Sequence, residues 1–221
     1  MDQKIFGEVD QYISDLFIKP DEALTAAEQS HKREDIPLIN VSPNLGKLLY
    51  LLAKLAHAEK ILEVGTLAGY STIWMAKALP KDGKLISLEI DPHHADIARK
   101  NIDRAGFSSK VEIRVGKAIE LLPELKEENA GPFDMIFIDA DKPPYAEYYE
   151  WAVKLSRPGT LIIADNVIRD GKVLNPDHAD PMVKGAQRFN KALAADSRVS
   201  ATILQTIGVK EYDGMAIAIV E

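Results

Sequence analysis

One stretch constrains the fold of this chain more than any other: residues 60–71, with the sequence KILEVGTLAGYS. An apolar run ends in an acid, a glycine loop follows, and an amphipathic segment begins at Tyr70. This order predicts a strand, a tight turn and a helix, which together open a nucleotide-type α/β site. The glycines let the backbone turn sharply and leave room for a ligand beside the helix N-terminus.

The spacing of Gly65 and Gly69 narrows the choice of ligand. It matches neither the dinucleotide fingerprint nor the P-loop, which requires Gly-Lys-Ser/Thr. Glu63 stands at the end of the strand, where a carboxylate would repel a pyrophosphate. Such a carboxylate suits a ligand that carries positive charge, such as an amino group or a sulfonium. The loop therefore favours S-adenosylmethionine (SAM) over NAD or ATP.

Composition sets broader limits. A length of 221 residues predicts one domain with an ample core. The net charge of -7 gives the chain no general attraction to nucleic acid or to an anionic membrane. It has no cysteine, so a disulfide, a thiolate nucleophile and a thiolate metal site are excluded. The first residues lack the apolar core of a signal peptide, and no apolar run reaches membrane length. We therefore expect a cytoplasmic enzyme or binding protein.

From Lys60 onward, apolar strand-like runs alternate with amphipathic segments and turn signals. Runs such as 135–138 and 161–164 are apolar throughout, as in a parallel sheet covered on both faces, so we predict a doubly wound α/β fold. The expected strands are 61–64, 84–89, 111–115, 135–139, 161–165, 200–205 and 216–220, the last two joined by a hairpin turn at 208–214. The expected helices between them are 70–79, 93–105, 118–125, 145–156 and 182–195.

Three further helices are expected before the first strand, at 3–17, 21–33 and 43–57, with Pro20 ending the first of them. They lie outside the βα repeat and have three possible roles: covering the ligand site, forming a dimer contact, or packing on the sheet. We predict a single domain over residues 1–221, in which 1–58 cover the site and 59–221 form the α/β core.

In such sheets the ligand lies beyond the carboxyl ends of the strands, so the residues after each strand matter most. Glu89 ends the second strand, where a carboxylate can accept both ribose hydroxyls of an adenosyl ligand. After the third strand, Gly116 and Ala118 leave space for an adenine ring, although an ordinary turn is as good an interpretation. Ser71 is either a local helix cap or a hydrogen-bond donor to the ligand.

The fourth and fifth strands end in Asp139 and in Asp165-Asn166, which neighbouring parallel strands would bring together. Two carboxylates and one amide oxygen leave about three positions of an octahedral Mg²⁺ open, and a catechol could chelate there. Mn²⁺ and Ca²⁺ are alternatives. The competing interpretation, that these acids cap helices, suits Asp141 but does not explain Asp165-Asn166. Lys142 would either stabilise a developing phenolate or accept its proton, unless it is simply solvated.

Together these residues resemble the cation-dependent class I O-methyltransferases of the caffeoyl-coenzyme A and catechol type. The resemblance runs from about Asn40 to the C-terminus. It is carried by NVSP at 40–43, LEVG-xxx-GYS at 62–71, FIDADK at 137–142 and DNV at 165–167.

The resemblance implies a sheet ordered 3-2-1-4-5-7-6 with strand seven antiparallel, and a homodimer. It also implies roles for single residues. Contacts to SAM fall on Val41, Glu63, Gly65, Thr66, Ser71, Glu89, Ala118, Asp139 and Asp141. The expected metal ligands are Asp139, Asp165 and Asn166, and the expected catalytic residues are Lys142 and Asp139.

Three features depart from the family pattern, and they leave the acceptor open. The N-terminal segment does not match the part that shapes the acceptor pocket in the plant enzymes. Asp170 stands where those enzymes offer an asparagine to the substrate, and the segment 207–214 is longer than the usual Gly-Asp-Gly turn.

The resulting hypothesis is methyl transfer from SAM to a hydroxyl of a catechol-like phenol, including phenylpropanoids and flavonoids. One alternative is a methyltransferase of hydroxylated wobble uridine in tRNA, which the acidic balance of the chain disfavours. The other is a non-catalytic protein that binds an adenosyl ligand, which the set of Asp139, Asp165, Asn166 and Lys142 disfavours.

Overall fold

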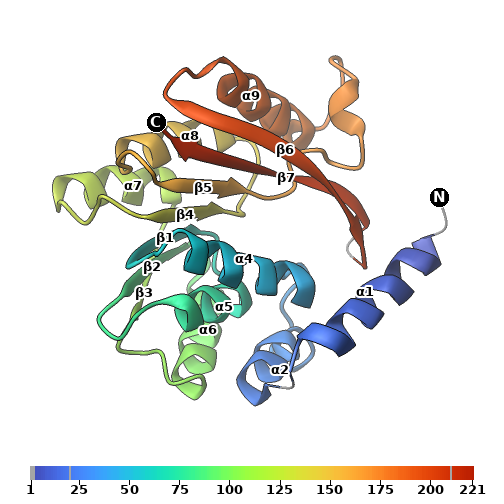
Figure 1. The fold of residues 1–221 in the computed structure, drawn as a ribbon, viewed down its shortest axis with the longest axis vertical. Helices are drawn as coiled ribbons and strands as arrows, with labels where there is room; N and C mark the ends of the chain where they lie inside the picture. Colours follow the sequence, from blue (N-terminus) through green and yellow to red (C-terminus); the bar gives the residue numbers. More distant parts are fainter. Residues whose placement is uncertain (1–2, 20, 210) are drawn as a thin grey trace.

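The computed structural model describes residues 3–19, 21–209 and 211–221. Pro20, the predicted end of the first helix, and Lys210, within the predicted hairpin turn, lie outside the described residues. The described chain folds around a seven-stranded sheet in the order β3-β2-β1-β4-β5-β7-β6, which confirms the predicted order (Figure 1). The strands are β1 (Lys60–Val64), β2 (Lys84–Glu89), β3 (Val111–Val115), β4 (Met135–Ile138), β5 (Leu161–Ala164), β6 (Val199–Gly208) and β7 (Glu211–Val220).

The helices lie close to the predicted segments. They are α1 (Gln3–Phe17), α2 (Glu22–Glu28), α3 (Ser30–Arg33), α4 (Pro43–Leu55), α5 (Tyr70–Ala78), α6 (Pro92–Arg104), α7 (Ala118–Glu127), α8 (Tyr145–Lys154), α9 (Pro181–Ala195) and the short 3-10 helix η1 (Lys172–Leu174). The single helix expected over 21–33 is wrong, because the segment is interrupted at Gln29, which ends α2 and precedes α3. Within the described residues, no helix is long and apolar enough to cross a membrane.

Strand β1 lies at the centre of the sheet and pairs in parallel with both β2 and β4, while β5 pairs in parallel with β4. Strand β7 pairs antiparallel with β5 and β6, as predicted. Alternate residues of each inner strand point to opposite faces, and both faces are apolar. In β4, for example, Ile136 and Ile138 pack on one side, and Met135 and Phe137 on the other.

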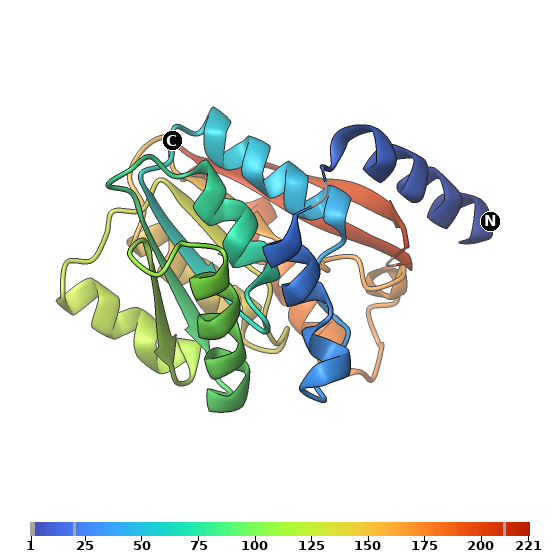
Figure 2. The same cartoon turned by 90° about the horizontal axis from the view of Figure 1, so that it is seen from below.

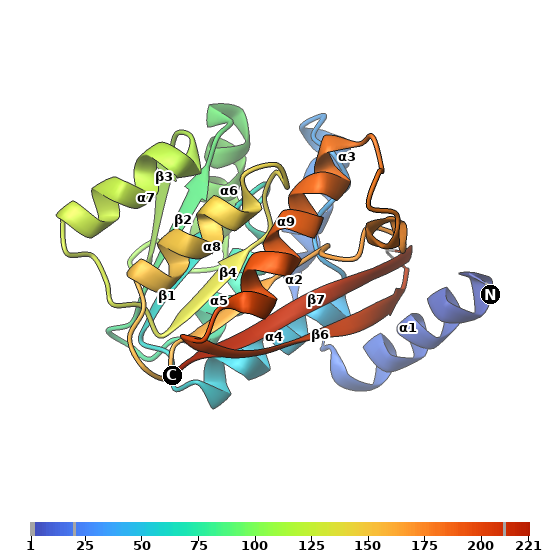
Figure 3. The same ribbon diagram turned by 90° about the horizontal axis from the view of Figure 1, so that it is seen from above.

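Helices cover both faces of the sheet (Figure 3). Side chains of α7, α8 and α9 fill one half of the core, and those of α4, α5 and α6 fill the other. Helix α4 sits tightly on α5, because a Cβ built at Gly46 would lie 2.3 Å from Cδ1 of Trp74. That close contact fixes an N-terminal helix against the first helix of the α/β core.

The predicted turn at 208–214 is wrong in its extent. Thr206, Ile207 and Gly208 still pair in β6 with Asp213, Tyr212 and Glu211 of β7, so the two strands continue almost to the tip. Gly208 and Gly214 indicated a long turn, but both lie within the strands. Gly214 packs closely against Ile168, since a Cβ on it would lie 2.4 Å from Cδ1 of Ile168 and displace that side chain. The long ribbon reaches the N-terminal helix α1 (Figure 2).

Candidate active site

The register of the inner strands brings three predicted site residues to one edge of the sheet. Val64 pairs with Ile138, and Ile138 pairs with Ala164. The next residue along each strand is Gly65, Asp139 and Asp165 respectively, so these three leave the sheet side by side. Gly65 has φ +100°, and a Cβ there would lie 2.1 Å from the carbonyl oxygen of Asp139. The first glycine of the loop is therefore required by a neighbouring backbone.

Asp165 is a buried carboxylate beside a second carboxylate. One oxygen, Oδ1, accepts the backbone N–H of Asn166 at 2.8 Å, which leaves Oδ2 for another partner. Burial raises the pKa of Asp165, and the negative charge of Asp139 raises it further. Asn166 has φ 58°, a left-handed conformation that asparagine tolerates better than most residues. Electrostatic repulsion between two acids at this edge is what a bound cation would relieve.

Lys142 contacts Asp139 and is buried, with only 3% of its surface exposed. Its ammonium donates three hydrogen bonds, to Oδ1 of Asp139 at 3.2 Å, to the carbonyl of Ala140 at 2.9 Å and to Oη of Tyr145 at 2.7 Å. All three N–H donors are therefore directed at protein oxygens. Its charge is held next to one candidate metal ligand.

Tyr145 fixes this arrangement through its hydroxyl group. Its buried hydroxyl lies 3.0 Å from the carbonyl oxygens of both Ile138 and Asp165, so one side chain spans the ends of β4 and β5. Burial, followed by the charges of Asp139 and Asp165, raises the pKa of Tyr145 well above 10 and keeps the hydroxyl neutral.

Glu63 is fully buried beneath the glycine loop. Its carboxylate accepts hydrogen bonds from Ser71 at 2.5 Å, from Ser87 at 2.6 Å and from Thr72. Burial raises the pKa of Glu63 to about 7, although the three hydroxyls act in the opposite direction. Glu63 and Ser71, both predicted to contact SAM, are therefore bound to each other.

The loop itself is held by Glu89. One carboxylate oxygen accepts the backbone N–H groups of Thr66 at 3.1 Å and Leu67 at 2.8 Å, and the other accepts that of Asp91 at 3.0 Å. The Thr66 hydroxyl lies 2.5 Å from Oγ of Ser87. Because Ser87 uses its only proton on Glu63, Thr66 is the donor. A continuous polar network thus links Glu89 to Glu63 through the loop.

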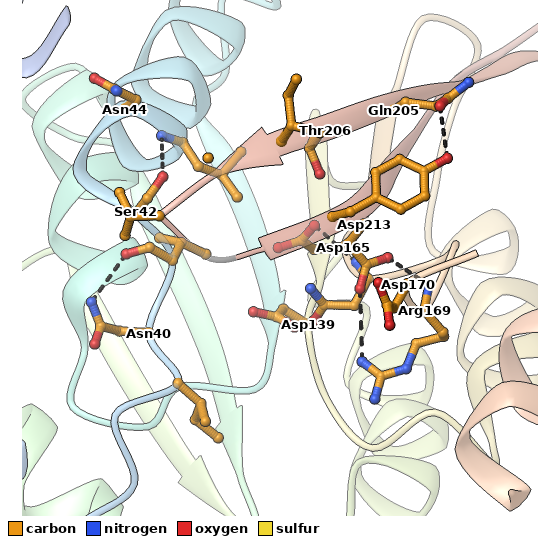
Figure 4. A pocket seen from close by; sticks show the side chains of 18 of the residues that line it. Asn40, Ser42, Asn44, Asp139, Asp165, Arg169, Asp170, Gln205, Thr206 and Asp213 are labelled. Atoms are coloured by element: carbon orange, nitrogen blue, oxygen red, sulfur yellow. Dashed lines mark hydrogen bonds and ion pairs between the residues drawn. The ribbon is translucent and has the colours of Figure 1, made fainter. Parts of the chain in front are cut away.

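A cavity of about 940 Å³ opens beside the two acids. Figure 4 shows Asn40, Ser42 and Asn44 on one side of it and Asp139, Asp165 and Asp213 on the other. Ser42 also caps α4, as predicted, by accepting the backbone N–H of Leu45 at 3.2 Å. The remaining lining residues come from α1, from the segment before α4 and the start of α4, from the segment after β5, from the start of α9 and from the β6–β7 hairpin.

Comparison with known proteins gives this geometry its context. A family model described as O-methyltransferase matches residues 19–219. The chain belongs to this O-methyltransferase family. It is 66% identical over 221 residues to the catechol O-methyltransferase of Niastella koreensis, with 100% of both chains covered. It is 38% identical over 200 residues to caffeoyl-CoA O-methyltransferase 1 of Zea mays, covering 86% of this chain and 77% of that protein.

A solved structure supports the cofactor. The O-methyltransferase TomG from Streptomyces achromogenes, determined in complex with SAM, superposes on this methyltransferase with a TM-score of 0.96. The two are 48% identical, and the match covers 100% of this chain and 99% of TomG. The predicted fold and enzyme class are thereby confirmed: this is a SAM-dependent O-methyltransferase.

The remaining residues predicted to contact SAM differ in their burial. Val41 is buried and lines the cavity, whereas Ala118 is buried as the first residue of α7. Asp141 is exposed and accepts the hydroxyl of Tyr148 at 2.8 Å, and α8 has no side-chain cap. The suggestion that Asp141 caps this helix is therefore wrong. Its predicted contact with SAM stays a prediction.

The predicted metal ligands present oxygen donors of the right kind. Among the described residues, no group of three His, Cys, Asp or Glu side chains is arranged to hold a metal ion. The predicted set differs from such a group, because its third donor is the amide of Asn166. Two carboxylates and an amide oxygen, lining one cavity, suit a hard divalent cation such as Mg²⁺.

Two cavity residues of the methyltransferase were missed by sequence reasoning. Asp213 accepts the backbone N–H groups of Ile168, Arg169 and Gly214 through Oδ1 and so fixes the segment after β5. Asp10 reaches the cavity from α1. Neither position carries a motif, and only the docking of distant segments brings them to the site.

Proposed function

We propose that this methyltransferase transfers the methyl group of SAM to one hydroxyl of a catechol-like phenol in a metal-dependent reaction. The observation that carries the proposal is the emergence of Asp139 and Asp165 side by side, with Asn166, in the wall of a cavity large enough for an aromatic ring. Two adjacent hydroxyls on a ring are the chemistry that a cation held by three protein oxygens would select.

Asp139, Asp165 and Asn166 would hold the cation. When bound there, it would act as a Lewis acid that lowers the pKa of the coordinated hydroxyls and fixes their position. The protein prepares this site without the cation, since Tyr145 ties the ends of β4 and β5 together and Lys142 orients Asp139. Positioning of this kind is worth a large part of the barrier in a two-substrate transfer.

Lys142 would act through its charge. All three of its N–H donors are directed at protein oxygens, which supports electrostatic stabilisation of the phenolate over acceptance of its proton. A buried ammonium next to developing negative charge needs no reorganisation during the reaction. The acidic network of Glu63 and Glu89 would serve the other substrate, because SAM carries a sulfonium, an amino group and ribose hydroxyls.

The cavity also offers apolar surface for the acceptor ring. Leu38, Ile39 and Val41 contribute it from the segment before α4, and Leu45 and Leu48 from α4 itself. These residues precede the α/β core, which supports the predicted covering role of residues 1–58. Apolar walls with a few convergent polar groups are typical of small-molecule sites.

We also propose a homodimer. The outer side of α1 exposes a row of large apolar side chains at helical spacing, namely Ile5, Val9, Tyr12 and Leu16. Such a row on a single helix marks an interaction site. Light scattering of the purified protein tests this, and a monomeric mass would overturn it. The cytoplasmic location expected from the sequence stays a prediction.

The decisive experiment for the reaction is methyl transfer from SAM to a small panel of catechols, first with Mg²⁺ and then with excess chelator. We expect activity that disappears with chelator and returns with added metal. Activity that chelator does not change would mean that the acidic set is misinterpreted. If SAM binds but no catechol is methylated, the acceptor class itself is wrong.

A further inference from the structure

Helix α1 lies outside the segment that the family model matches, which begins at residue 19, yet it forms part of the cavity wall. Its contribution is Asp10. Oδ1 of Asp10 accepts a hydrogen bond from Nδ2 of Asn44 at 3.0 Å, and Oδ2 accepts the backbone N–H of Val209 at 2.8 Å. One side chain therefore joins α1 to α4 and to the tip of the β6–β7 hairpin, which lies beside α1 in Figure 2.

The Asp10 carboxylate is closely surrounded by its neighbours. A Cβ built on Gly208 would lie 2.1 Å from Oδ2 of Asp10, so a larger residue there would displace this carboxylate. Asn44 is fixed in turn, since it donates to the backbone carbonyl of Asp10 at 3.1 Å and accepts the hydroxyl of Ser14 at 3.1 Å. The groups that bind the carboxylate are a neutral amide and a backbone N–H. They fix the position of the carboxylate but do not neutralise its negative charge, which therefore remains at the wall of the cavity.

The rest of the cavity adds to this charge. Six aspartates line it, against one arginine and one lysine, which gives a formal charge of four negative units. A divalent cation at the proposed metal site would cancel half of that. Arg169 lies 3.9 Å from Asp213 and Lys172 lies 3.6 Å from Asp170, so the two charges that remain fall on Asp10 and Asp180.

We propose that α1 completes the acceptor pocket and that Asp10 sets its charge preference, so that cationic and neutral catechols are favoured over anionic ones. The inference rests on the proposed function, since it concerns the acceptor of that reaction. A fixed negative charge in a partly enclosed pocket attracts a positive substituent and repels a negative one, most strongly at low salt. Coenzyme A thioesters, which carry several phosphate charges, belong to the disfavoured class.

The test uses three acceptors of similar size and different charge: 3,4-dihydroxyphenylethylamine, 3,4-dihydroxyphenylethanol and 3,4-dihydroxyphenylacetate. We measure kcat/KM for each with Mg²⁺ and saturating SAM, at low and at high salt. We expect the order amine, alcohol, acid, with about a tenfold difference between amine and acid at low salt that shrinks as salt is added.

Asp10→Asn removes the charge and keeps the shape of the side chain. It should reduce the ratio of amine to acid by about threefold or more and leave the alcohol nearly unchanged. Asp15→Asn is the matched control, because Asp15 is exposed on the same helix, bonds Gln11 and does not line the cavity. It should leave the ratio as it is. The salt dependence of the parent protein supplies a measurement that does not require the variant to fold.

The outcomes separate the two proposals. If the alcohol is methylated but the three acceptors react equally well, the charge preference is wrong and the proposed function stands. If Asp10→Asn and Asp15→Asn change the ratio alike, the effect belongs to overall charge, and the assignment to Asp10 is wrong. If none of the three is methylated while SAM binds, the proposed function fails and this inference fails with it.

Discussion

Glu63→Gln should change how the stability of this methyltransferase depends on pH. Glu63 is fully buried, and burial raises its pKa from an ordinary 4.5 to about 7. Each pKa unit corresponds to about 1.4 kcal/mol, so the free energy of unfolding contains a contribution of about 3 kcal/mol from the protonated form. Glutamine has the same shape, and its amide oxygen can accept the hydroxyls of Thr72 and Ser87, which share one oxygen of Glu63, while its NH2 group faces Ser71. It does not ionise in this range.

The sign follows from the raised pKa. The folded protein holds a proton on Glu63 that the unfolded chain releases near its ordinary pKa of 4.5. The stabilisation is therefore complete below about pH 4.5 and is lost as the pH rises toward about 7. Above that pH the parent keeps a buried charge, whereas Glu63→Gln has none. We expect the free energy of unfolding of the parent to fall, relative to the variant, by about 2.5 kcal/mol between pH 5 and pH 8, because part of the stabilisation is already lost at pH 5.

Urea denaturation at pH 5, 6, 7 and 8 measures this directly. The quantity of interest is the difference between parent and variant at each pH, because all other titrating groups are common to both proteins. Glu59→Gln is the matched control, since Glu59 is exposed four residues earlier and should give no such trend. If the difference between parent and Glu63→Gln is the same at all four pH values, Glu63 keeps an ordinary pKa and the account of its burial is wrong.

Three other predictions follow from the site. Asp165→Asn should lower kcat by about 100-fold or more in the presence of Mg²⁺, because it removes a predicted metal ligand. It should also raise the melting temperature of the metal-free protein at pH 8, because it removes a buried charge beside Asp139. Lower stability together with unchanged activity would contradict both parts. If the ammonium of Lys142 acts on the acceptor alone, Lys142→Met should lower kcat by about 100-fold and leave the Kd for S-adenosylhomocysteine unchanged. Calorimetry measures this Kd. Gly65→Ala should destabilise the fold by about 3 kcal/mol or more in urea, because the new Cβ meets the carbonyl of Asp139, whereas Gly106→Ala should cost only about 1 kcal/mol because its Cβ would meet nothing within 4 Å.

The fold could be predicted because the information is local and repeated. Apolar runs such as 135–138 and 161–164 are too short and too uniformly apolar for surface helices, and the turn residues between elements fix their limits. The order of the strands came from the family resemblance, since alternation alone does not specify it. The errors arose where tertiary contacts decide. Gly214 indicated a turn, but it lies inside β7, where Ile168 packs closely against it.

The candidate site divides in the same way. Asp139 and Asp165 could be brought together from sequence, because neighbouring parallel strands end at the same edge. The partners of Glu63 could not, because they depend on the register that places Ser87 opposite it and on the angle at which α5 leaves the loop. Asp10 was the least predictable residue of all. An amphipathic helix in a sequence shows that one of its sides will be covered, but not by which part of the molecule.

The polar network under the loop shapes how the cofactor can bind. Glu89 holds the backbone N–H groups of Thr66 and Leu67 through a single oxygen, and its second oxygen is bound to the N–H of Asp91. A ribose that bonds to this carboxylate must share those oxygens or replace one of the backbone groups. Leu67 has φ 50°, a conformation that costs a leucine free energy and that the bond to Glu89 helps to maintain. If SAM contacts Glu89 as predicted, its binding and the shape of the glycine loop are coupled through one carboxylate, and a change at Glu89 should affect both.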